Sequence, residues 1–305
     1  MLLGVDVGGT NLRVGVVDGL AVIDSMRVQA DFSGLCRSQP PQAALAAIHA
    51  TLLEAMQALL HKHPGVSAIG IGFPGFIDPA SGCVTQSPNL PGLHDVDLLT
   101  PLRAQLDRPL IIENDALAAA FGEFHLLPQQ GGGLVYLGLG TGVGGGMVYG
   151  GAPHTGEHGV AMEVGHLIVE PGGRQCGCGN RGCMEQYSST GGVVQSYREA
   201  TGTTLAQREI AQLAASGDAA ALAAYAIAGE RLAQALAHIL KVADIGHVVI
   251  GGGMSAAWSL IAPAFEQRLE ADLIPALRGR VRVSLSRAND QAGMIGAALL
   301  AARQG

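Results

Sequence analysis

Two glycine- and threonine-rich turns, each between apolar strands, constrain the fold of this chain most. The first turn is Gly8-Gly9-Thr10-Asn11 and the second is Gly140-Thr141-Gly142, and apolar runs flank both of them, from Leu2 to Val17 and from Leu134 to Tyr149. Such runs predict strands. Glycine lets the backbone approach a ligand closely, and backbone N–H groups with a threonine hydroxyl suit phosphate oxygens. Two such turns far apart in sequence predict two halves that grip one polyphosphate.

These turns have other interpretations. Each turn taken alone could be a simple tight hairpin, and this alternative stays open. The second also fits the Gly-x-Gly-x-x-Gly dinucleotide pattern, but that pattern needs a following helix, and Met147-Val148-Tyr149-Gly150-Gly151 follows instead. A lysine-containing phosphate loop is excluded, because the only lysines are Lys62 and Lys241. No His-Arg-Asp catalytic loop occurs, so the chain does not read as a protein kinase.

The composition is that of a globular protein with room for two domains. The chain has 305 residues, 48% of them hydrophobic and 14% charged, enough for a large core. The net charge is −7 and no basic run occurs, which argues against nucleic acid and against an anionic membrane surface. The N-terminus lacks a basic region, and Asp6 interrupts its apolar stretch, so we expect no signal peptide and a cytoplasmic protein.

Strand and helix patterns alternate along the chain, which predicts an α/β fold. After the first hairpin, the predicted strands are 21–27, 68–73, 110–112, 247–250 and 281–285. The predicted helical regions are 42–62, 116 onward, 190–241, 262–277 and 293–302, while 31–41 and 87–92 read as loops. The second glycine-rich hairpin opens a new segment. We therefore predict a small domain, 1–115, and a larger one, 116–290.

Three side chains at strand ends are candidates for phosphoryl-transfer chemistry. Asp115 follows a buried strand, where a carboxylate can accept the proton of a substrate hydroxyl, and Asn114 beside it can bind a second hydroxyl. Both types are also preferred helix N-caps, so a capping role is the alternative. Asp6 precedes the first phosphate turn, where Mg²⁺ on nucleotide phosphates would relieve the repulsion between carboxylate and phosphate. An ordinary turn aspartate is the alternative there.

A histidine and three cysteines predict a structural zinc site. His166, Cys176, Cys178 and Cys183 have the spacing His-x9-Cys-x-Cys-x4-Cys, with glycines that let a tight loop wrap an ion. Three thiolates and one imidazole suit tetrahedral Zn²⁺, and five cysteines with three clustered argue against a disulfide framework. Free buried thiols are the alternative. Glu163 and Glu185 flank this loop and could bind sugar hydroxyls, although surface glutamates are usually only solvated.

Taken in order, these motifs resemble the ROK family of bacterial sugar kinases and sugar-responsive repressors, over essentially the whole chain. The matching motifs are Asp6-x-Gly8-Gly9-Thr10-Asn11, Gly72-x-Pro74-Gly75, Glu113-Asn114-Asp115-Ala116, Gly140-Thr141-Gly142-x-Gly144-Gly145-Gly146, Glu163-x-Gly165-His166, Cys176-x-Cys178-Gly179-x-x-Gly182-Cys183 and Gly251-Gly252-Gly253. The resemblance implies the actin-like, ribonuclease H-like ATPase fold, with two domains around a cleft and the C-terminal helix, 291–305, packed on the first. It also implies ATP-dependent phosphorylation of a hexose, and a homodimer.

The resemblance assigns roles to individual residues. Asp115 matches the catalytic base. The residues that match sugar contacts are Gly75, Asn89, Asn114, Asp115, Glu163, His166 and Glu185, so His166 would serve both zinc and sugar. The residues expected around ATP and Mg²⁺ are Asp6, Gly8, Gly9, Thr10, Asn11, Gly140, Thr141, Gly142, Gly251, Gly252 and Gly253, the last three near adenosine.

The sugar is the least determined part of the prediction. Leu117 stands where the family often has asparagine, and Met162 stands where glycine is usual before Glu163. The stretches 151–166 and 87–91 look most like allose kinases, with glucokinases close behind. The bulk of Met162 favours an unsubstituted aldohexose, allose or glucose, phosphorylated at the 6-hydroxyl. The alternatives are an N-acetylglucosamine or N-acetylmannosamine kinase, a sugar-binding module without catalysis, and a sugar-responsive repressor. A repressor would need a DNA-binding segment before Asp6.

Overall fold

The computed structural model describes residues 1–128, 131–288 and 290–303, and these form two compact units. Unit 1 comprises Met1–Tyr136, Gly146–Ala161 and Arg287–Gly305, and unit 2 comprises Leu137–Gly145 and Met162–Ser286. The predicted domains, 1–115 and 116–290, stay a prediction, and the last two residues of the predicted segment 291–305 lie outside the described residues.

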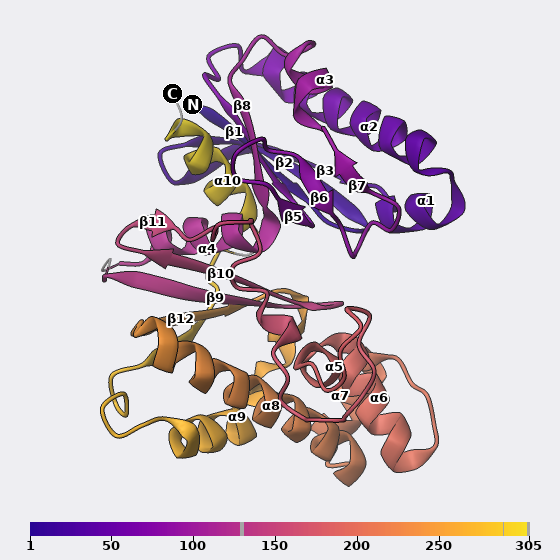
Figure 1. The fold of residues 1–305 in the computed structure, drawn as a ribbon, viewed down its shortest axis with the longest axis vertical. Coiled ribbons are helices and arrows are strands. Elements are labelled where there is room, and N and C mark those ends of the chain that lie inside the picture. Colours follow the sequence, from indigo (N-terminus) through magenta and orange to yellow (C-terminus); the bar gives the residue numbers. More distant parts are fainter. Residues whose placement is uncertain (129–130, 289, 304–305) are drawn as a thin grey trace. The chain divides into compact units, whose positions relative to one another are not determined.

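A five-stranded sheet forms the centre of unit 1 (Figure 1). Its strands, in spatial order, are β3 (Ala21–Gln29), β2 (Asn11–Asp18), β1 (Leu2–Val7), β4 (Ile69–Phe73) and β8 (Leu110–Asn114). β1 pairs antiparallel with β2 and parallel with β4, and β4 pairs parallel with β8. The carboxyl ends of β1, β4 and β8 therefore meet at one edge of the sheet. The hairpin β1–β2 and the strand β3 agree with the sequence prediction.

The strand period of two gives the sheet two different faces. One face carries Leu3, Ile69 and Ile71, which are fully buried in a cluster with α2 (Pro41–Lys62). The opposite face carries glycines, and α10 (Ala292–Ala302) lies against them. A Cβ on Gly4 would lie 1.9 Å from the Met294 carbonyl oxygen, so only glycine permits this approach. α4 (Asp115–Leu126) packs on the same side, against α10.

Unit 1 also contains elements that the sequence did not predict. The predicted loop 31–41 is wrong, because α1 (Phe32–Ser38) occupies most of it, with the Asp31 side chain accepting a hydrogen bond from the Gly34 amide at its N-terminus. A small three-stranded sheet was missed, consisting of β5 (Phe76–Ile77), β6 (Val84–Gln86) and β7 (His94–Val96). α3 (Leu99–Arg103) follows it.

α2 is long and apolar enough to cross a membrane by length and composition alone. Its buried residues are Ala44, Ile48, Leu52, Ala55, Met56 and Leu59. These side chains belong to the core cluster that includes the strands of the sheet. The helix therefore packs as the core helix of a globular unit does, and its apolar face is already covered.

A second five-stranded sheet has the order β11-β10-β9-β12-β13. Its strands are β11 (Ala152–Pro153), β10 (Val143–Tyr149), β9 (Gly133–Leu139), β12 (His247–Gly251) and β13 (Arg282–Leu285). β9 and β10 are divided between the two units. The predicted second hairpin, with its turn at 140–142, is present as β9 and β10.

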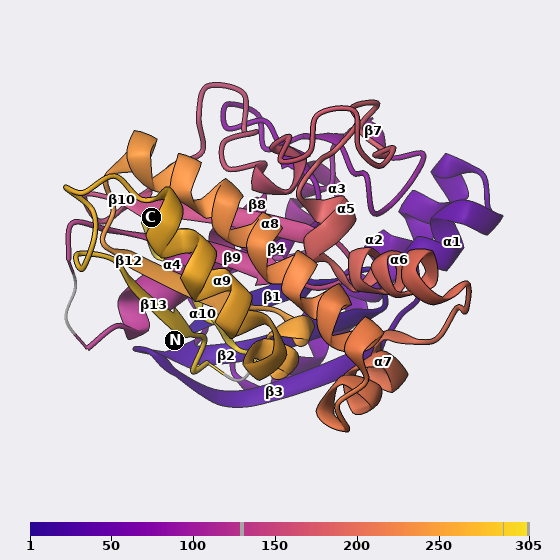
Figure 2. The ribbon, with the colours of Figure 1, turned by 90° about the horizontal axis from the view of Figure 1, so that it is seen from below.

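The helices of unit 2 carry its core. They are α5 (Glu185–Ser188), α6 (Thr190–Thr201), α7 (Gln207–Ala215), α8 (Ala219–Ala243) and α9 (Trp258–Asp272), with short 3-10 helices η1 (Val164–His166) and η2 (Gly253–Ala257). The predicted helical region 190–241 is thus three helices, and α9 begins and ends earlier than the predicted 262–277. α8 and α9 lie side by side (Figure 2). Gly229 of α8 allows this, because a Cβ there would lie 2.5 Å from the Ile261 carbonyl oxygen.

Candidate active site

The parallel strands of unit 1 bring two aspartates to the same sheet edge. Asp6 in β1 is in register with Gly72 in β4, and Gly72 is in register with Glu113 in β8. Asp115 follows two residues after Glu113. Gly72 lies between the two acidic positions without a side chain, and a Cβ there would lie 3.5 Å from Asp115 Cα. The negative charge of Asp6 raises the pKa of Asp115, so the two carboxylates are close enough to interact electrostatically.

Asn114 is the N-cap of α4, so the capping alternative is confirmed for this residue. Its Oδ1 accepts a hydrogen bond from the Leu117 amide at 3.0 Å, and its Nδ2 donates to the Gly75 carbonyl oxygen at 3.0 Å. Asp115 is therefore not required as the cap. It occupies the first helical position, where its Oδ1 accepts from the Ala116 amide at 2.8 Å.

Asp115 has the acid–base properties that a general base needs. Burial raises the pKa of its carboxyl from 3.8 to about 7, and the negative charge of Asp6 raises it further, while the hydrogen bond from Ala116 opposes the rise. A base whose pKa lies near neutrality is partly ionised at physiological pH and still holds a proton well in the transition state. The position and the pKa of Asp115 thus fit the predicted role.

Asp6 is surrounded by groups that leave its charge only partly compensated. Burial raises the pKa of its carboxyl, while Arg13, whose Nη1 lies 3.3 Å from Oδ2, lowers it. The other guanidinium nitrogen of Arg13 is 2.8 Å from Asp290, so one arginine faces two carboxylates. Gly293 of α10 packs directly against the Asp6 carboxylate, since a Cβ there would lie 3.0 Å from Asp6 Cγ. Oxygen ligands with unbalanced negative charge suit Mg²⁺, and Asp6 offers them.

The first phosphate turn is held in shape by its own backbone and by α1. The Gly8 amide donates to the Asn11 carbonyl oxygen at 2.8 Å, and the Ser33 amide donates to the Gly9 carbonyl oxygen at 3.0 Å. Ser33 also fixes Asn89, because its hydroxyl donates to the Asn89 carbonyl oxygen at 2.8 Å. Thr10 is exposed at the tip of the turn. The turn and the predicted sugar loop thus share one anchor.

Gly75 is a glycine for two independent reasons. Its φ is +153°, and a Cβ there would lie 2.7 Å from the Gln86 carbonyl oxygen. The neighbouring Pro74 carbonyl accepts a hydrogen bond from the buried Ser87 hydroxyl. Together with the Asn114 contact, these bonds fix the loop after β4 against the loop after β6. They also orient the backbone of the predicted sugar loop.

The second phosphate turn lies beside the glycines that end β12. Within the turn, the Gly140 amide donates to the Gly142 carbonyl oxygen at 2.9 Å. Gly252 has a φ of +79°, and a Cβ there would lie 2.2 Å from the Leu139 carbonyl oxygen. Gly252, between Gly251 and Gly253, is therefore in contact with the end of β9, just before the turn. Unit 2 brings these two predicted ATP-binding segments together.

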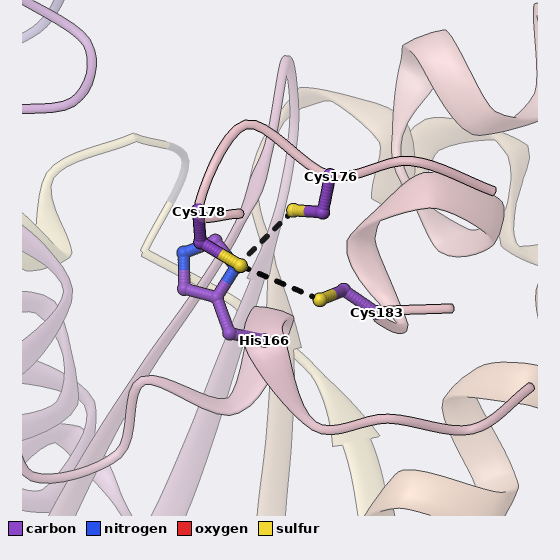
Figure 3. Close-up of side chains that lie close together, drawn as sticks. All are labelled: His166, Cys176, Cys178 and Cys183. Atoms are coloured by element: carbon purple, nitrogen blue, oxygen red, sulfur yellow. Dashed lines mark hydrogen bonds between the residues drawn. The ribbon is translucent and has the colours of Figure 1, made fainter. Parts of the chain in front are cut away.

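His166, Cys176, Cys178 and Cys183 form one cluster, and their side chains converge in Figure 3. Their ligand atoms all lie within 4.8 Å of one another. The Cys178 and Cys183 sulfur atoms are 3.6 Å apart, and Cys176 Sγ is 3.6 Å from His166 Nδ1. Ligands about 2.3 Å from a tetrahedral zinc ion are separated by about 3.8 Å. The spacing of the four atoms therefore fits Zn²⁺.

The chemistry of the cluster also favours a cation. Burial and the neighbouring thiols raise the pKa of Cys183 to about 12, because a thiolate there would be poorly solvated and close to other sulfurs. A bound divalent ion reverses this effect by stabilising thiolates. The loop closes tightly because Gly182 has no side chain, and a Cβ there would lie 1.7 Å from the Glu170 carbonyl oxygen. These four residues could hold one zinc ion.

The imidazole of His166 has two differently placed nitrogens. Nδ1 faces the cysteines, whereas Nε2 lies 3.9 Å from the Glu163 carboxylate. The ring can therefore bind a metal through one nitrogen and leave the other beside a predicted sugar-binding residue. Glu185 follows Cys183 by two residues, and its Oε2 accepts a hydrogen bond from the Val143 amide at 3.0 Å.

The predicted residues are divided between the two units. Those in unit 1 are Asp6, Gly8, Gly9, Thr10, Asn11, Gly75, Asn89, Asn114 and Asp115. Those in unit 2 are Gly140, Thr141, Gly142, Glu163, His166, Cys176, Cys178, Cys183, Glu185, Gly251, Gly252 and Gly253. Their assembly into one site around a cleft stays a prediction.

Sequence reasoning missed two arginines that support these residues. Arg13 sits opposite Asp6 in the β1–β2 register, and pairing the hairpin residues around the turn could have found it. Arg174 anchors the cysteine loop by donating to the Gln186 carbonyl oxygen at 2.7 Å and to Glu199 at 2.6 Å. Its guanidinium also lies 4.5 Å from the centre of the Tyr187 ring. No local signal marks Arg174, because its partners come later in the chain.

A cavity of about 400 Å³ lies along β8 in unit 1. Glu113 and Arg103 line it, but neither Asn114 nor Asp115 does. Arg103 donates to the Leu110 carbonyl oxygen at 2.7 Å, and Glu113 accepts from the Asn114 amide at 2.8 Å. Because these charged groups are engaged by the backbone, the cavity does not identify a ligand. The aspartates at the sheet edge remain the better candidate.

Comparison with known proteins shows which family this chain resembles. The ROK family model matches residues 2–304. A glucokinase of Thermotoga maritima is 32% identical over 314 residues, which cover 97% of this chain and 96% of that protein. An N-acetyl-D-glucosamine kinase of Salmonella heidelberg is 32% identical over 315 residues, which cover 98% and 99%. The crystal structure of a ROK family glucokinase from Streptomyces griseus in complex with glucose and AMPPNP matches with a TM-score of 0.81 at 30% identity, covering 100% and 99% of the two chains. The actin-like α/β fold predicted from the sequence is thereby confirmed.

Proposed function

The chain belongs to the ROK family, and we propose that it phosphorylates an aldohexose at the 6-hydroxyl. It is an ATP-dependent sugar kinase, as its glucokinase and N-acetylglucosamine kinase relatives are. The observation that carries the proposal is Asp115, a partly buried carboxylate at the end of β8 whose pKa is raised to about 7. A base of this kind, next to a second carboxylate and a phosphate-type turn, fits transfer of a phosphoryl group to an alcohol.

In the proposed reaction, Asp115 accepts the proton of the 6-hydroxyl as the sugar oxygen attacks the γ-phosphorus of ATP in line. The bond between the γ-phosphorus and the β,γ-bridging oxygen breaks, and ADP leaves. Asp6 is the residue that would hold Mg²⁺ near the phosphates. When bound, Mg²⁺ neutralises charge on the phosphate oxygens. The backbone amides of the two glycine-rich turns bind these oxygens.

The sugar-binding roles that we propose follow from the positions of the polar groups. The Asn114 amide is fixed between α4 and Gly75, so it presents its remaining hydrogen-bonding capacity in one orientation. Glu163 and His166 Nε2 lie together at 3.9 Å, on the side of the imidazole away from the cysteines. We propose that this pair and Glu185 bind the hydroxyls of the ring. The zinc loop then acts indirectly, by holding His166 and Glu185 in place.

For the identity of the sugar, we keep glucose or its 3-epimer allose as the proposal. Relatives named glucokinase and N-acetyl-D-glucosamine kinase are equally identical to this chain, so identity does not choose between the two classes. The feature that favours an unsubstituted sugar is Met162, which precedes Glu163 and is half-buried with a φ of +66°. A thioether side chain there leaves less room for an N-acetyl group than glycine would. A pocket rejects added bulk by steric contact.

A coupled kinase assay tests the function and the substrate together. We expect kcat/KM to be highest for glucose or allose when these are compared with mannose, fructose, N-acetylglucosamine and N-acetylmannosamine. A higher kcat/KM for either N-acetyl sugar would show that Met162 does not set the specificity. Asp115→Ala should lower kcat by ~10²–10⁴-fold, and near wild-type activity would contradict the assignment of the base.

Three further properties belong to the same proposal. The two predicted domains close over the sugar, which excludes water and limits ATP hydrolysis, and small-angle scattering with and without sugar would detect the change. The protein acts as a homodimer, which sedimentation would establish. A cytoplasmic location belongs to the proposal as well.

A further inference from the structure

The carboxylate of Glu185 touches the second phosphate turn. Its Oε2 accepts a hydrogen bond from the Val143 amide at 3.0 Å, and Val143 directly follows the turn 140–142. Gly142 makes room for this contact, because a Cβ there would lie 2.4 Å from Glu185 Oε2. The turn and Glu185 are therefore fitted to each other, although 42 residues separate Val143 from Glu185.

A second contact joins the same two segments. The Thr190 amide donates to the Gly140 carbonyl oxygen at 2.9 Å. The segment from Glu185 to Thr190 is therefore hydrogen-bonded to both ends of the turn. Gly165 packs against the same place, because a Cβ there would lie 2.4 Å from the Val143 carbonyl oxygen and 3.5 Å from Glu185 Cβ. Gly165 precedes His166. The residues beside the second phosphate turn are thus neighbours of the residues that we propose to bind zinc and sugar.

Glu185 still has an oxygen available. In the part of the chain that the structure describes, Oε2 has its partner in the Val143 amide, and no hydrogen bond from the protein reaches Oε1. The residue is half-buried, so its carboxylate is not sealed in the core. A carboxylate can accept several hydrogen bonds at once, since its two oxygens offer about four lone-pair sites.

We propose that Glu185 couples sugar binding to ATP binding, with Oε1 accepting a sugar hydroxyl while Oε2 holds the second phosphate turn. The proposal rests on the proposed function, and it adds a positioning role for Glu185 toward the nucleotide. A sugar on Oε1 fixes the carboxylate, and the fixed carboxylate orders the Val143 amide and the turn before it. ATP then binds to a turn that is already ordered. Without sugar, the turn is more mobile and the affinity for ATP is lower.

Coupling of this kind is reciprocal, so either ligand raises the affinity for the other by the same factor. Couplings between ligands are typically 5- to 150-fold, and we expect about tenfold here because the contact is one hydrogen bond to a partly exposed carboxylate. Calorimetric titration of the Mg²⁺ complex of AMPPNP, a non-hydrolysable ATP analogue, with and without saturating glucose measures this factor directly. The measurement needs no turnover.

Three variants separate the two contacts of Glu185. Glu185→Ala removes both, so we expect the tenfold enhancement of analogue affinity by glucose to disappear and KM for ATP to rise. Glu185→Gln keeps an oxygen that can accept from the Val143 amide, so KM for ATP should stay within about twofold of wild type while KM for the sugar rises. Glu163→Gln, a proposed sugar contact away from the turn, should raise KM for the sugar and keep the coupling factor at saturating sugar.

The outcomes of this experiment are distinct. The proposal is overturned if Glu185→Ala keeps the tenfold coupling, or if glucose leaves the affinity of the wild-type protein for the analogue unchanged while the protein still phosphorylates glucose. If no hexose is phosphorylated by the wild type, the proposed function fails instead. Zinc content and circular dichroism of each variant show whether the cysteine loop is intact. Glu185→Gln provides the comparison if Glu185→Ala folds poorly.

Discussion

Replacing Asp115 by asparagine should make the protein less active and more stable at the same time. The two side chains have the same shape, but asparagine carries no charge and does not titrate. A carboxyl whose pKa is raised by burial favours the folded state only while it is protonated. Its contribution is complete below the unfolded pKa of 3.8, and it is lost as pH rises through about 7.

The magnitude follows from the shift of the pKa. A rise from 3.8 to about 7 corresponds to about 4 kcal/mol, at 1.36 kcal/mol per pKa unit. The side chain is only partly buried, so solvent reduces the effect, and we expect Asp115→Asn to raise the free energy of unfolding by about 1–2 kcal/mol at pH 8. At pH 4 the difference between variant and wild type should vanish.

Urea unfolding at a series of pH values, without nucleotide or Mg²⁺, measures the difference, and a coupled assay measures kcat. We expect kcat to fall by ~10²–10⁴-fold. Asp97→Asn is the control, because hydrogen bonds from Thr100 lower the pKa of the Asp97 carboxyl. That aspartate stabilises the fold above its unfolded pKa, so its replacement should destabilise at pH 8. If Asp115→Asn is no more stable than the wild type at pH 8, the raised pKa of Asp115 is refuted.

Three further predictions test other parts of the molecule. The kcat/KM should fall tenfold per pH unit below about 7, and a flat kcat/KM between pH 5.5 and 8 would argue against Asp115 as the base. Met162→Gly should be about 1 kcal/mol more stable than Met162→Ala by denaturant titration. Both variants lose the side chain, but only glycine accepts a φ of +66° without strain, so equal stabilities would contradict the strain at this position. Protein purified without added metal should contain about one zinc per chain by elemental analysis, and Cys178→Ser should lower zinc content and activity together. Full activity of a zinc-free Cys178→Ser variant would mean that the loop does not position the sugar.

The sequence predicted the parts of the fold whose cause is local. Apolar runs around the turns at 8–11 and 140–142 suffice to predict the hairpins, because hairpin strands are neighbours in sequence. α1 was missed because Ser33-Gly34 resembles a turn, and the helix depends on the Asp31 cap and on burial of Phe32. β5 to β7 were missed because strands of two or three residues have no measurable periodicity.

In the candidate site too, local features were predictable from the sequence and tertiary contacts were not. The four metal-binding candidates lie within 18 residues, and their spacing alone predicted the cluster that the structure contains. Arg13 on Asp6 and Glu185 on the Val143 amide were not predicted, because these contacts depend on register and on tertiary packing. The raised pKa of Asp115 also needed the fold, since it arises from burial and from Asp6, which is distant in sequence.

The glycine face of the first sheet has a consequence for how the protein is made. Its cover, α10, begins at Ala292, whereas the last strand of the sheet ends at Asn114, so a ribosome that adds about 5–20 residues per second completes the strands roughly 9–36 s before it reaches the helix. During that interval α10 cannot cover the face opposite α2, and α4 alone can pack there. The first unit can therefore reach its native packing only after the C-terminal helix emerges.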